Sequence, residues 1–341
     1  MVLRWLATMI IFLSGSGFTA SAAEFYTGKT IRFIVGASAG GGFDIYTRAI
    51  ARYMSKHVPG NPTIIVDNMA GAGSLVSANY MYNLAKPDGL TVGLWSSTLI
   101  LQQVMGGVKG IEFNGQKYEW IGVPSPDSVV CALTKASGVN SMETWLAAKE
   151  PVKFGGQVPG VPPSDSPRIL KGVLNLPIQL IEGYKGTSDI RLAADAGEVS
   201  GACYAWESLK VQWRTGIESG NVKVIVQAVS KRHPDLPDVP SAIEFAKTPE
   251  DSQLIKVALN DINLINRAYS LPPGTPKENV KILRTAFAAT MKDPEFLSEA
   301  KKSNLNIQPM SGEEVEIKVQ ELFRLSPNLV SRLRDILVPK N

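Results

Sequence analysis

The stretch Ile31-Arg32-Phe33-Ile34-Val35-Gly36-Ala37-Ser38-Ala39-Gly40-Gly41-Gly42-Phe43-Asp44-Ile45-Tyr46 decides the fold. Its first five residues are mostly apolar and β-branched, which predicts a buried strand over 31–35. Apolar residues at helical spacing follow and predict a helix over 45–56. The glycines therefore form a strand-to-helix turn, with Asp44 in the cap or first-turn position. Because such a turn presents unpaired backbone N–H groups and a positive helix end, it is a receptacle for an anion.

The length and composition suit a globular protein of two domains. The chain has 341 residues, of which 19% are charged and 44% hydrophobic. The formal net charge is +4, and the basic residues are spread along the chain without a dense run. Because nucleic-acid-binding proteins gather Lys and Arg on one face, this distribution argues against nucleic acid as a partner.

The first 23 residues have the pattern of a signal peptide. Arg4 provides a basic start, residues 5–13 form an apolar segment, and Ala20-Ser21-Ala22-Ala23 offers small residues for cleavage. The apolar segment is shorter than the ~20 residues that a membrane-spanning helix needs. We therefore expect cleavage after Ala22 or Ala23 and export of a soluble protein.

Strands and helices alternate after the first helix. Strands are expected over 63–66 and 90–95, followed by the turns Asn68-Met69-Ala70-Gly71-Ala72-Gly73-Ser74 and Ser96-Ser97-Thr98. Such alternation predicts an α/β unit with a parallel sheet. Because open α/β sheets bind ligands at the carboxyl ends of their strands, both turns are candidate binding segments.

The second half of the chain repeats this alternation, which predicts two α/β lobes that face each other. Lobe 1 is expected to comprise residues 24–123 and 255–341, and lobe 2 residues 124–254. Within lobe 2 we expect a long proline-rich loop over 155–167, followed by a helix over 168–174.

Several side chains near these turns allow two interpretations. Asp44 either stabilises its own helix or accepts a hydrogen bond from a ligand. Four aromatic residues at strand or loop ends either pack the lobe edges or line the ligand cleft. They are Phe43, Tyr184, Tyr204 and Trp206. Cys131 and Cys203 form either a disulfide, which export permits, or two buried thiols.

Gly36-Ala37-Ser38-Ala39-Gly40 also matches the G-x-S-x-G turn that carries the nucleophile of α/β-hydrolases. An exported serine hydrolase using Ser38 is therefore an alternative. The chain has only two histidines, His57 and His233, and neither is well placed to complete a triad. Dinucleotide and P-loop fingerprints are absent, as is a metal-ligand cluster, so we expect no cofactor and no metal.

A series of motifs resembles one family over nearly the whole mature chain. The motifs are Gly41-Gly42-x-Asp44 with Arg48, Val66-x-Asn68-x-x-Gly71-Ala72-Gly73, Pro87-Asp88-Gly89-x-Thr91, Gly183-Tyr184-Lys185-Gly186-Thr187, Arg232-x-x-x-Leu236-Pro237-Asp238-Val239-Pro240 and Pro273-Gly274-Thr275-Pro276. In this order they resemble the substrate-binding proteins of tripartite tricarboxylate transporters, the TctC or Bug family.

The resemblance implies a two-lobe, type II periplasmic-binding-protein fold that closes on a small organic carboxylate without catalysis. It further implies a periplasmic monomer that delivers its ligand to two membrane subunits of a transporter. Backbone N–H groups and ordered waters of two loops would hold the carboxylate. The implied ligand-binding residues are Ser38, Ala39, Gly41, Gly42, Phe43, Asp44, Gly73, Ser74, Ser96, Ser97, Gln157, Pro159, Val161, Ser164, Ser166, Tyr184, Gly186, Tyr204 and Trp206.

Two positions depart from the family pattern and bear on the ligand. The second loop of the family is commonly rich in Gly, Ser and Thr, whereas residues 158–166 include three prolines, which lack N–H donors. Phe43 occupies a position that is more often small or polar. Both departures favour a bulkier, partly apolar acid, such as an aromatic one. A ligand sensor that docks on a membrane kinase is a further alternative to a transport receptor.

Overall fold

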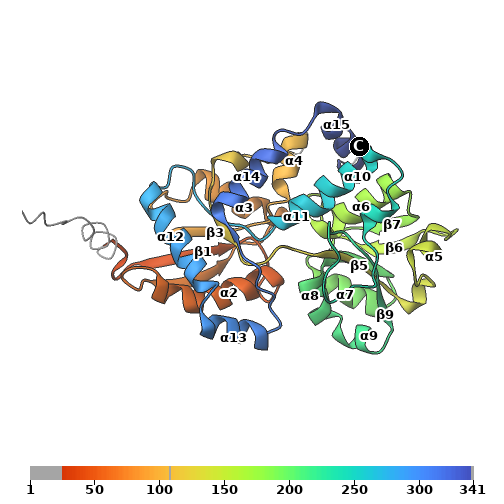
Figure 1. The fold of residues 1–341 in the computed structure, drawn as a ribbon, viewed down its shortest axis with the longest axis horizontal. Coiled ribbons are helices and arrows are strands. Elements are labelled where there is room, and N and C mark those ends of the chain that lie inside the picture. The colour runs from red at the N-terminus through yellow and green to blue at the C-terminus, as the bar shows by residue number, and fades with distance from the viewer. Residues whose placement is uncertain (1–24, 107–108, 339–341) are drawn as a thin grey trace, which may run out of the picture.

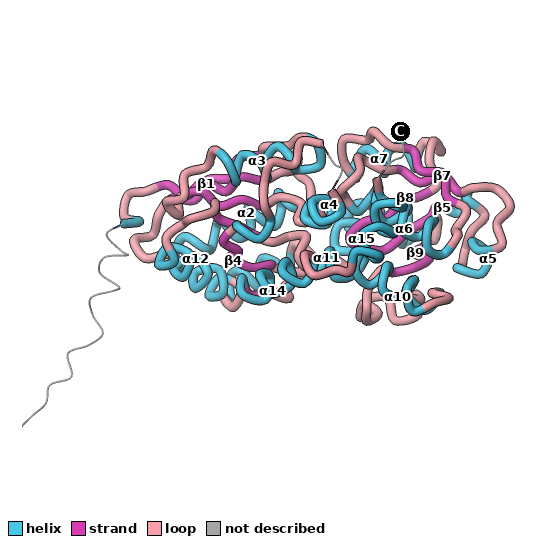
Figure 2. The backbone as a smooth tube through the Cα atoms, turned by 90° about the horizontal axis from the view of Figure 1, so that it is seen from above, coloured by secondary structure: helices cyan, strands magenta, loops and turns pink. Residues whose placement is uncertain are grey.

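Two β-sheets, each covered by helices, lie side by side in the computed structural model of the chain (Figure 1). The structure describes residues 25–106 and 109–338, so the expected signal peptide and its cleavage site lie outside the described residues. We call the part around the six-stranded sheet lobe 1 and the part around the five-stranded sheet lobe 2. Figure 2 shows both from above, with α4 and α11 between them.

The sheet of lobe 1 has the strand order β11-β4-β10-β3-β1-β2. Its strands are β1 (Thr30–Val35), β2 (Thr63–Asn68), β3 (Thr91–Leu94), β4 (Glu119–Val123), β10 (Tyr269–Leu271) and β11 (Met310–Ser311). β1 pairs in parallel with β2 and β3, whereas β10 and β11 pair in antiparallel fashion. The parallel pairing expected for the first three strands is therefore confirmed. The antiparallel edge arises because β10 enters lobe 1 on the chain's return from lobe 2.

The sheet of lobe 2 is also mixed, with the order β7-β6-β8-β5-β9. Its strands are β5 (Val129–Thr134), β6 (Val152–Gly155), β7 (Ile178–Ile181), β8 (Gly201–Ala205) and β9 (Val222–Gln227). β5 runs antiparallel to both β8 and β9. Cys131 on β5 lies opposite Cys203 on β8, with 4.0 Å between their Cα atoms, and a disulfide joins them. The pairing that the sequence left open is thus a cross-strand bridge.

Helices cover both sheets. They are α2 (Gly42–Met54), α3 (Leu75–Asn83), α4 (Leu99–Met105), α5 (Met142–Leu146), α6 (Pro162–Leu174), α7 (Thr187–Asp195), α8 (Trp206–Gln212), α9 (Arg214–Glu218), α10 (Pro249–Ile255), α11 (Ile262–Leu264), α12 (Lys277–Thr290), α13 (Pro294–Lys302), α14 (Gly312–Leu322) and α15 (Pro327–Leu337). α2 is amphipathic, and its buried Ala49, Ile50 and Met54 join one core cluster with Phe33 of β1. This packing fixes the start of α2 at the carboxyl end of β1. No helix in the described ranges is long and apolar enough to cross a bilayer.

The chain passes between the lobes at residues 124–128 and again at residues 255–268, where a π-helical segment (Lys256–Asp261) leads into α11. The expected lobe boundaries, at 123/124 and 254/255, stay a prediction. The C-terminal helix α15 packs on α6 of lobe 2 as well as on α4 of lobe 1. α15 thus contacts helices of both lobes.

Candidate functional site

The first turn of α2 presents free backbone amides towards lobe 2. Gly41 is the N-cap residue and has an extended conformation, and no side chain caps the helix. The first N–H to find a carbonyl in the helix is that of Ile45, which donates to Gly41 O at 3.0 Å. The amides of Gly42, Phe43 and Asp44 precede it and have no acceptor within the helix. They lie where the glycine turn predicts an anion receptacle, and the binding of an anion there stays a prediction.

Asp44 holds the glycine turn in shape. Its carboxylate accepts hydrogen bonds from the Gly40 amide at 2.9 Å, from Arg48 Nε at 3.0 Å and from Asn68 Nδ2 at 3.0 Å. Asn68 Nδ2 also donates to Ala37 O at 2.9 Å. Burial alone would raise the pKa of Asp44, but these donors outweigh it and hold that pKa below its ordinary value. With its oxygens engaged in this way, Asp44 acts as a positioning residue for the turn.

The second glycine turn brings lobe 1 against lobe 2. Gly73 has a φ of +61°, which favours glycine, and Ser74 Oγ donates to Gly36 O at 2.7 Å. A Cβ atom at Gly73 would lie 2.9 Å from a methyl group of Val158 and 3.1 Å from one of Val161. The side chain of Ser74 is therefore committed to the turn, and Gly73 makes room for the lobe contact.

The segment expected as a proline-rich loop is partly helical. α6 begins at Pro162, six residues before the expected start at 168, so Ser164 and Ser166 lie in its first turns. Proline is tolerated in the first turn of a helix, because the N–H groups there have no acceptor. Pro162 and Pro163 have no N–H, and the Ser164 amide donates to Val161 O at 3.0 Å. The start of α6 therefore offers fewer free amides than the start of α2.

Polar contacts join the lobes beside the start of α6. Thr98 Oγ1 donates to Gly160 O, and Gln102 Nε2 on α4 donates to Asp165 Oδ2 at 3.0 Å. The other carboxylate oxygen of Asp165 accepts from the Gly160 amide at 3.0 Å. Burial raises the pKa of Asp165 to about 7, although Gly160, Arg168 and Gln102 act in the opposite direction. These contacts hold the two lobes against each other along this edge.

Two buried hydroxyl groups beside these contacts have no hydrogen-bond partner. Ser97 directly precedes Thr98 in lobe 1, and Ser164 directly precedes Asp165 in lobe 2. Both residues are fully buried, and neither Oγ atom has a partner among the described residues. Because buried polar groups are normally hydrogen-bonded, these two are candidates for contacts to a ligand.

Ser96 forms hydrogen bonds that connect the two crossings between the lobes. Its Oγ contacts Thr98 Oγ1 at 2.6 Å and donates to Asn266 Oδ1 at 2.8 Å. Asn266 Nδ2 in turn donates to Asp127 Oδ2 at 2.7 Å, and Asp127 pairs with buried Arg267. One hydrogen-bonded network therefore runs from the end of β3 through both crossings.

The aromatic candidates lie mainly in the lobe cores. Tyr204 and Trp206 belong to a core cluster of lobe 2, where Tyr204 Oη donates to Gln212 at 2.8 Å and Trp206 Nε1 to Asp235 at 2.9 Å. Tyr184 packs against the same cluster from a partly buried position. Phe43 packs on the lobe 1 core and faces the Arg267 guanidinium. In the structure Tyr204 and Trp206 therefore pack in the core of lobe 2, which is one of the two roles that the sequence allows.

The remaining candidates occupy the loops around the lobe contact. Ser38 and Ala39 are exposed on the glycine turn, and Pro159 is exposed on the loop before α6. Gln157 Nε2 donates to Lys185 O at 3.2 Å, and Gly186 is the N-cap residue of α7. Gln157 thus stabilises the turn that leads into α7.

The contacts of both histidines give no support to a hydrolase. His57 Nε2 lies 2.8 Å from Asp293 Oδ2, and His233 Nε2 lies 3.8 Å from Glu207 Oε1. Neither histidine has a recorded contact with Ser38. Among the described residues no group of His, Cys, Asp and Glu side chains is arranged to hold a metal ion.

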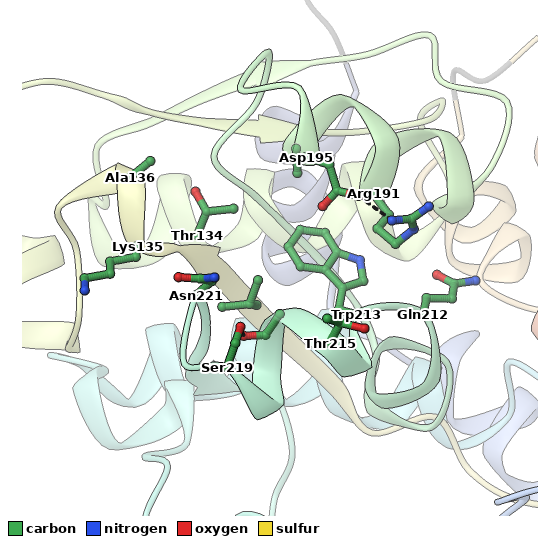
Figure 3. A pocket seen from close by; sticks show the side chains of 13 residues that line it. Thr134, Lys135, Ala136, Arg191, Asp195, Gln212, Trp213, Thr215, Ser219 and Asn221 are labelled. Carbon is green, nitrogen blue, oxygen red and sulfur yellow. Dashed lines mark hydrogen bonds and ion pairs between the residues drawn. The ribbon is translucent and has the colours of Figure 1, made fainter.

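A surface pocket lies elsewhere on lobe 2. It has a volume of about 570 Å³ and includes residues from the end of β5, α7, α9 and the start of β9. Figure 3 shows Trp213 at its centre, between Arg191 of α7 and Thr215 of α9. Residues 134–136 and 222 lie at the ends of β5 and β9 that are remote from the crossing at 124–128, so this pocket is separate from the lobe contact.

Sequence reasoning missed five residues of the lobe contact. Thr98 is the N-cap residue of α4 and Gln102 lies within α4, both soon after the Ser96-Ser97 pair, and Asp165 stands between two named serines, so closeness in sequence could have suggested them. The other two are Arg267 and Ser208 of α8, whose Oγ accepts from Arg267 Nη2 at 3.3 Å, and neither carried a local signal. They reach the site only through the fold.

Comparison with known proteins agrees with this architecture. A family model described as the tripartite tricarboxylate transporter family receptor, TctC, matches residues 46–334. A UPF0065 protein of Cupriavidus necator is 23% identical over 322 residues, which are 91% of this chain and 89% of that protein.

Solved structures of periplasmic binding proteins show the same fold. BugD has a TM-score of 0.70 at 20% identity, covering 93% of this chain and all of that one. MatC from Rhodopseudomonas palustris with bound malate has a TM-score of 0.69 at 20% identity, covering 91% and 99%. Because the family model spans most of the chain, the chain belongs to the TctC family of receptors, which are solute-binding proteins and not enzymes.

Proposed function

We propose that this protein is a periplasmic receptor that captures an organic carboxylate between its lobes and delivers it to the membrane subunits of a tripartite transporter. The observation that carries the proposal is the set of free amides of Gly42, Phe43 and Asp44, held in place by the carboxylate of Asp44. A helix start of this kind stabilises negative charge, since amide dipoles and unpaired N–H groups meet there.

The ligand is expected to contact both lobes. The amides of α2 and the Ser97 hydroxyl would bind it from lobe 1, and the Ser164 hydroxyl from lobe 2. A ligand that bridges two lobes favours their closed arrangement, because it interacts with both only when they approach each other. Capture therefore needs no chemical step.

Two structural neighbours that were solved with ligands support a carboxylate. MatC was solved with malate, and another Rhodopseudomonas palustris protein with adipate, at a TM-score of 0.69 and 18% identity. In this chain Pro162 and Pro163 remove donors from the lobe 2 side, while Val158 and Val161 add apolar surface. We infer a partly apolar acid, such as an aromatic one, in preference to a compact tricarboxylate.

A thermal-shift screen tests the proposal. The panel consists of malate, adipate, citrate and benzoate, with adipamide and benzamide as uncharged matched controls. A ligand at one hundred times its Kd stabilises the folded protein by about 2.7 kcal/mol, so a binding acid raises Tm measurably. We expect at least one acid, and neither amide, to raise Tm. Equal effects of benzoate and benzamide would contradict carboxylate recognition, and a response to citrate and malate alone would contradict the apolar preference.

A further inference from the structure

Arg267 is a buried cation with one unused donor. It lies in the second crossing, two residues before the start of β10, and is 2% exposed. Its Nε donates to Asp127 Oδ1, and its Nη2 donates to Ser208 Oγ of α8 at 3.3 Å. Its third nitrogen, Nη1, is buried and has no hydrogen-bond partner among the described residues. A buried guanidinium N–H without an acceptor is costly, which indicates that a partner is missing.

The unused nitrogen lies at the start of α2. The guanidinium carbon is 4.7 Å from the ring centre of Tyr46 and 5.7 Å from that of Phe43, so these two rings of α2 hold it in place. A Cβ atom at Gly42 would lie 3.2 Å from Nη1 and 3.4 Å from Nη2. The free N–H of Arg267 is therefore adjacent to the free amides of the first turn.

Two positive groups meet at this point. The helix start carries a partial positive charge beside the Arg267 guanidinium, whose own charge Asp127 balances, so an anion placed at Nη1 interacts favourably with both groups. Both oxygens of Asp127 are engaged, one by Arg267 and the other by Asn266. The nearby carboxyl of Glu207 accepts from the Ser128 amide, and burial and then Asp127 raise its pKa. The other oxygen of Glu207, Oε1, is also buried without a hydrogen-bond partner, but among the described residues no ion pair joins it to Arg267, so Nη1 has no acceptor from either carboxyl group.

We propose that Arg267 is a specificity-determining residue whose Nη1 donates a charged hydrogen bond to the ligand carboxylate at the start of α2. This inference rests on the proposed function and adds a side-chain cation to a site otherwise made of backbone amides. Because Arg267 also contacts Ser208 of lobe 2, it couples the carboxylate to the approach of the lobes. The site thus selects carboxylates over neutral isosteres through a residue that the family resemblance does not imply.

The test compares three variants by isothermal titration with adipate and with benzoate. Arg267→Lys keeps the charge but changes the donor geometry. Asp127→Asn combined with Arg267→Gln removes the whole ion pair, so no uncompensated buried charge is left. Arg214→Gln changes an exposed arginine on α9 and serves as the matched control. Circular dichroism and Tm without ligand establish that each variant is folded.

We use the acid that binds the unaltered protein more tightly. We expect its Kd to be about 10- to 150-fold larger for the double variant, because a charged hydrogen bond is lost. The Kd of Arg267→Lys should lie between the Kd of the unaltered protein and that of the double variant. The Kd of Arg214→Gln should equal that of the unaltered protein. A folded double variant, or a folded Arg267→Lys variant, that binds within threefold of the unaltered protein would overturn the inference and leave the proposed function intact. If no acid of the panel of malate, adipate, citrate and benzoate binds the unaltered protein, the proposed function and this inference are both refuted.

Discussion

Replacing Asp165 by asparagine should make the protein more stable at neutral and basic pH. The carboxylate lies in the first turns of α6 and is 8% exposed. Asparagine can keep both hydrogen bonds, since its Oδ1 can accept from the Gly160 amide and its Nδ2 can donate to Gln102. Gln102 Oε1 is buried without a partner, so the Gln102 amide can turn to become the acceptor. The substitution therefore removes the charge and the ion pair of 3.7 Å with Arg168 Nη1, and leaves both hydrogen bonds.

The expected magnitude follows from the pKa of Asp165. Burial raises this pKa from 3.8 to about 7, against the opposing effects of the Gly160 amide, Arg168 and Gln102. The two pKa values differ by roughly three, and a difference of one corresponds to about 1.4 kcal/mol. Ionised Asp165 therefore lowers the free energy of unfolding by at most about 4 kcal/mol. Because the folded protein binds the proton more tightly than the unfolded chain, the free energy of unfolding decreases as the pH rises from about 4 to about 7. Arg168 and its ion-pair partner Glu182 are unchanged by the substitution.

The assay is urea denaturation at pH 5, 6, 7 and 8, followed by circular dichroism. The difference between Asp165→Asn and the unaltered protein should be about 1.5 kcal/mol at pH 5, should increase to about 4 kcal/mol at pH 7, and should change little from pH 7 to pH 8. Asp189→Asn, which changes an exposed carboxylate in the first turn of α7, is the matched control and should keep the original pH dependence. If Asp165→Asn shows the same pH dependence as the unaltered protein, the account of this buried carboxyl is refuted.

Three further outcomes follow. Gly42→Ala places a Cβ 2.6 Å from Ser208 Oγ of lobe 2, so the lobes should close less readily. Overpacking typically costs about 1–3 kcal/mol, so the Kd for adipate or benzoate should increase about 5- to 150-fold. Adding Ser208→Gly should restore the Kd in calorimetry, and a Kd that is not restored would contradict the lobe contact. Asp44→Ala should cost about 1–3 kcal/mol, because it leaves donors of the glycine turn unpaired; an unchanged urea midpoint would contradict its positioning role. Replacing Cys131 and Cys203 together by alanine opens a link that spans 72 residues and should cost about 4 kcal/mol; a Tm that is unchanged would argue against the bridge.

Local patterns in the sequence predicted the α2 half of the site. The strand, the glycine turn and the helix are contiguous, so the alternation of residue types alone places free amides at the end of β1. Asp44 was left with two interpretations, because its partners Arg48 and Asn68 are 4 and 24 residues away and only the fold brings them together.

The other half of the site was harder to predict for two physical reasons. Prolines at 162, 163 and 167 resemble a loop, yet the first turn of a helix tolerates proline, so the start of α6 was placed too late. Arg267 is separated by 140 residues from Asp127 and by 59 from Ser208, and no local pattern reports such contacts. Tyr204 follows the alternation of β8 into the lobe 2 core, which its place near a strand end did not reveal.

A crystal structure of the protein with the most tightly bound acid of the panel tests the central claim most directly. The account predicts a carboxylate oxygen within about 3 Å of the Gly42 or Phe43 amide nitrogen, the usual distance of such a hydrogen bond. An acid bound elsewhere, with the amides at the start of α2 facing away from its carboxylate, would contradict the account.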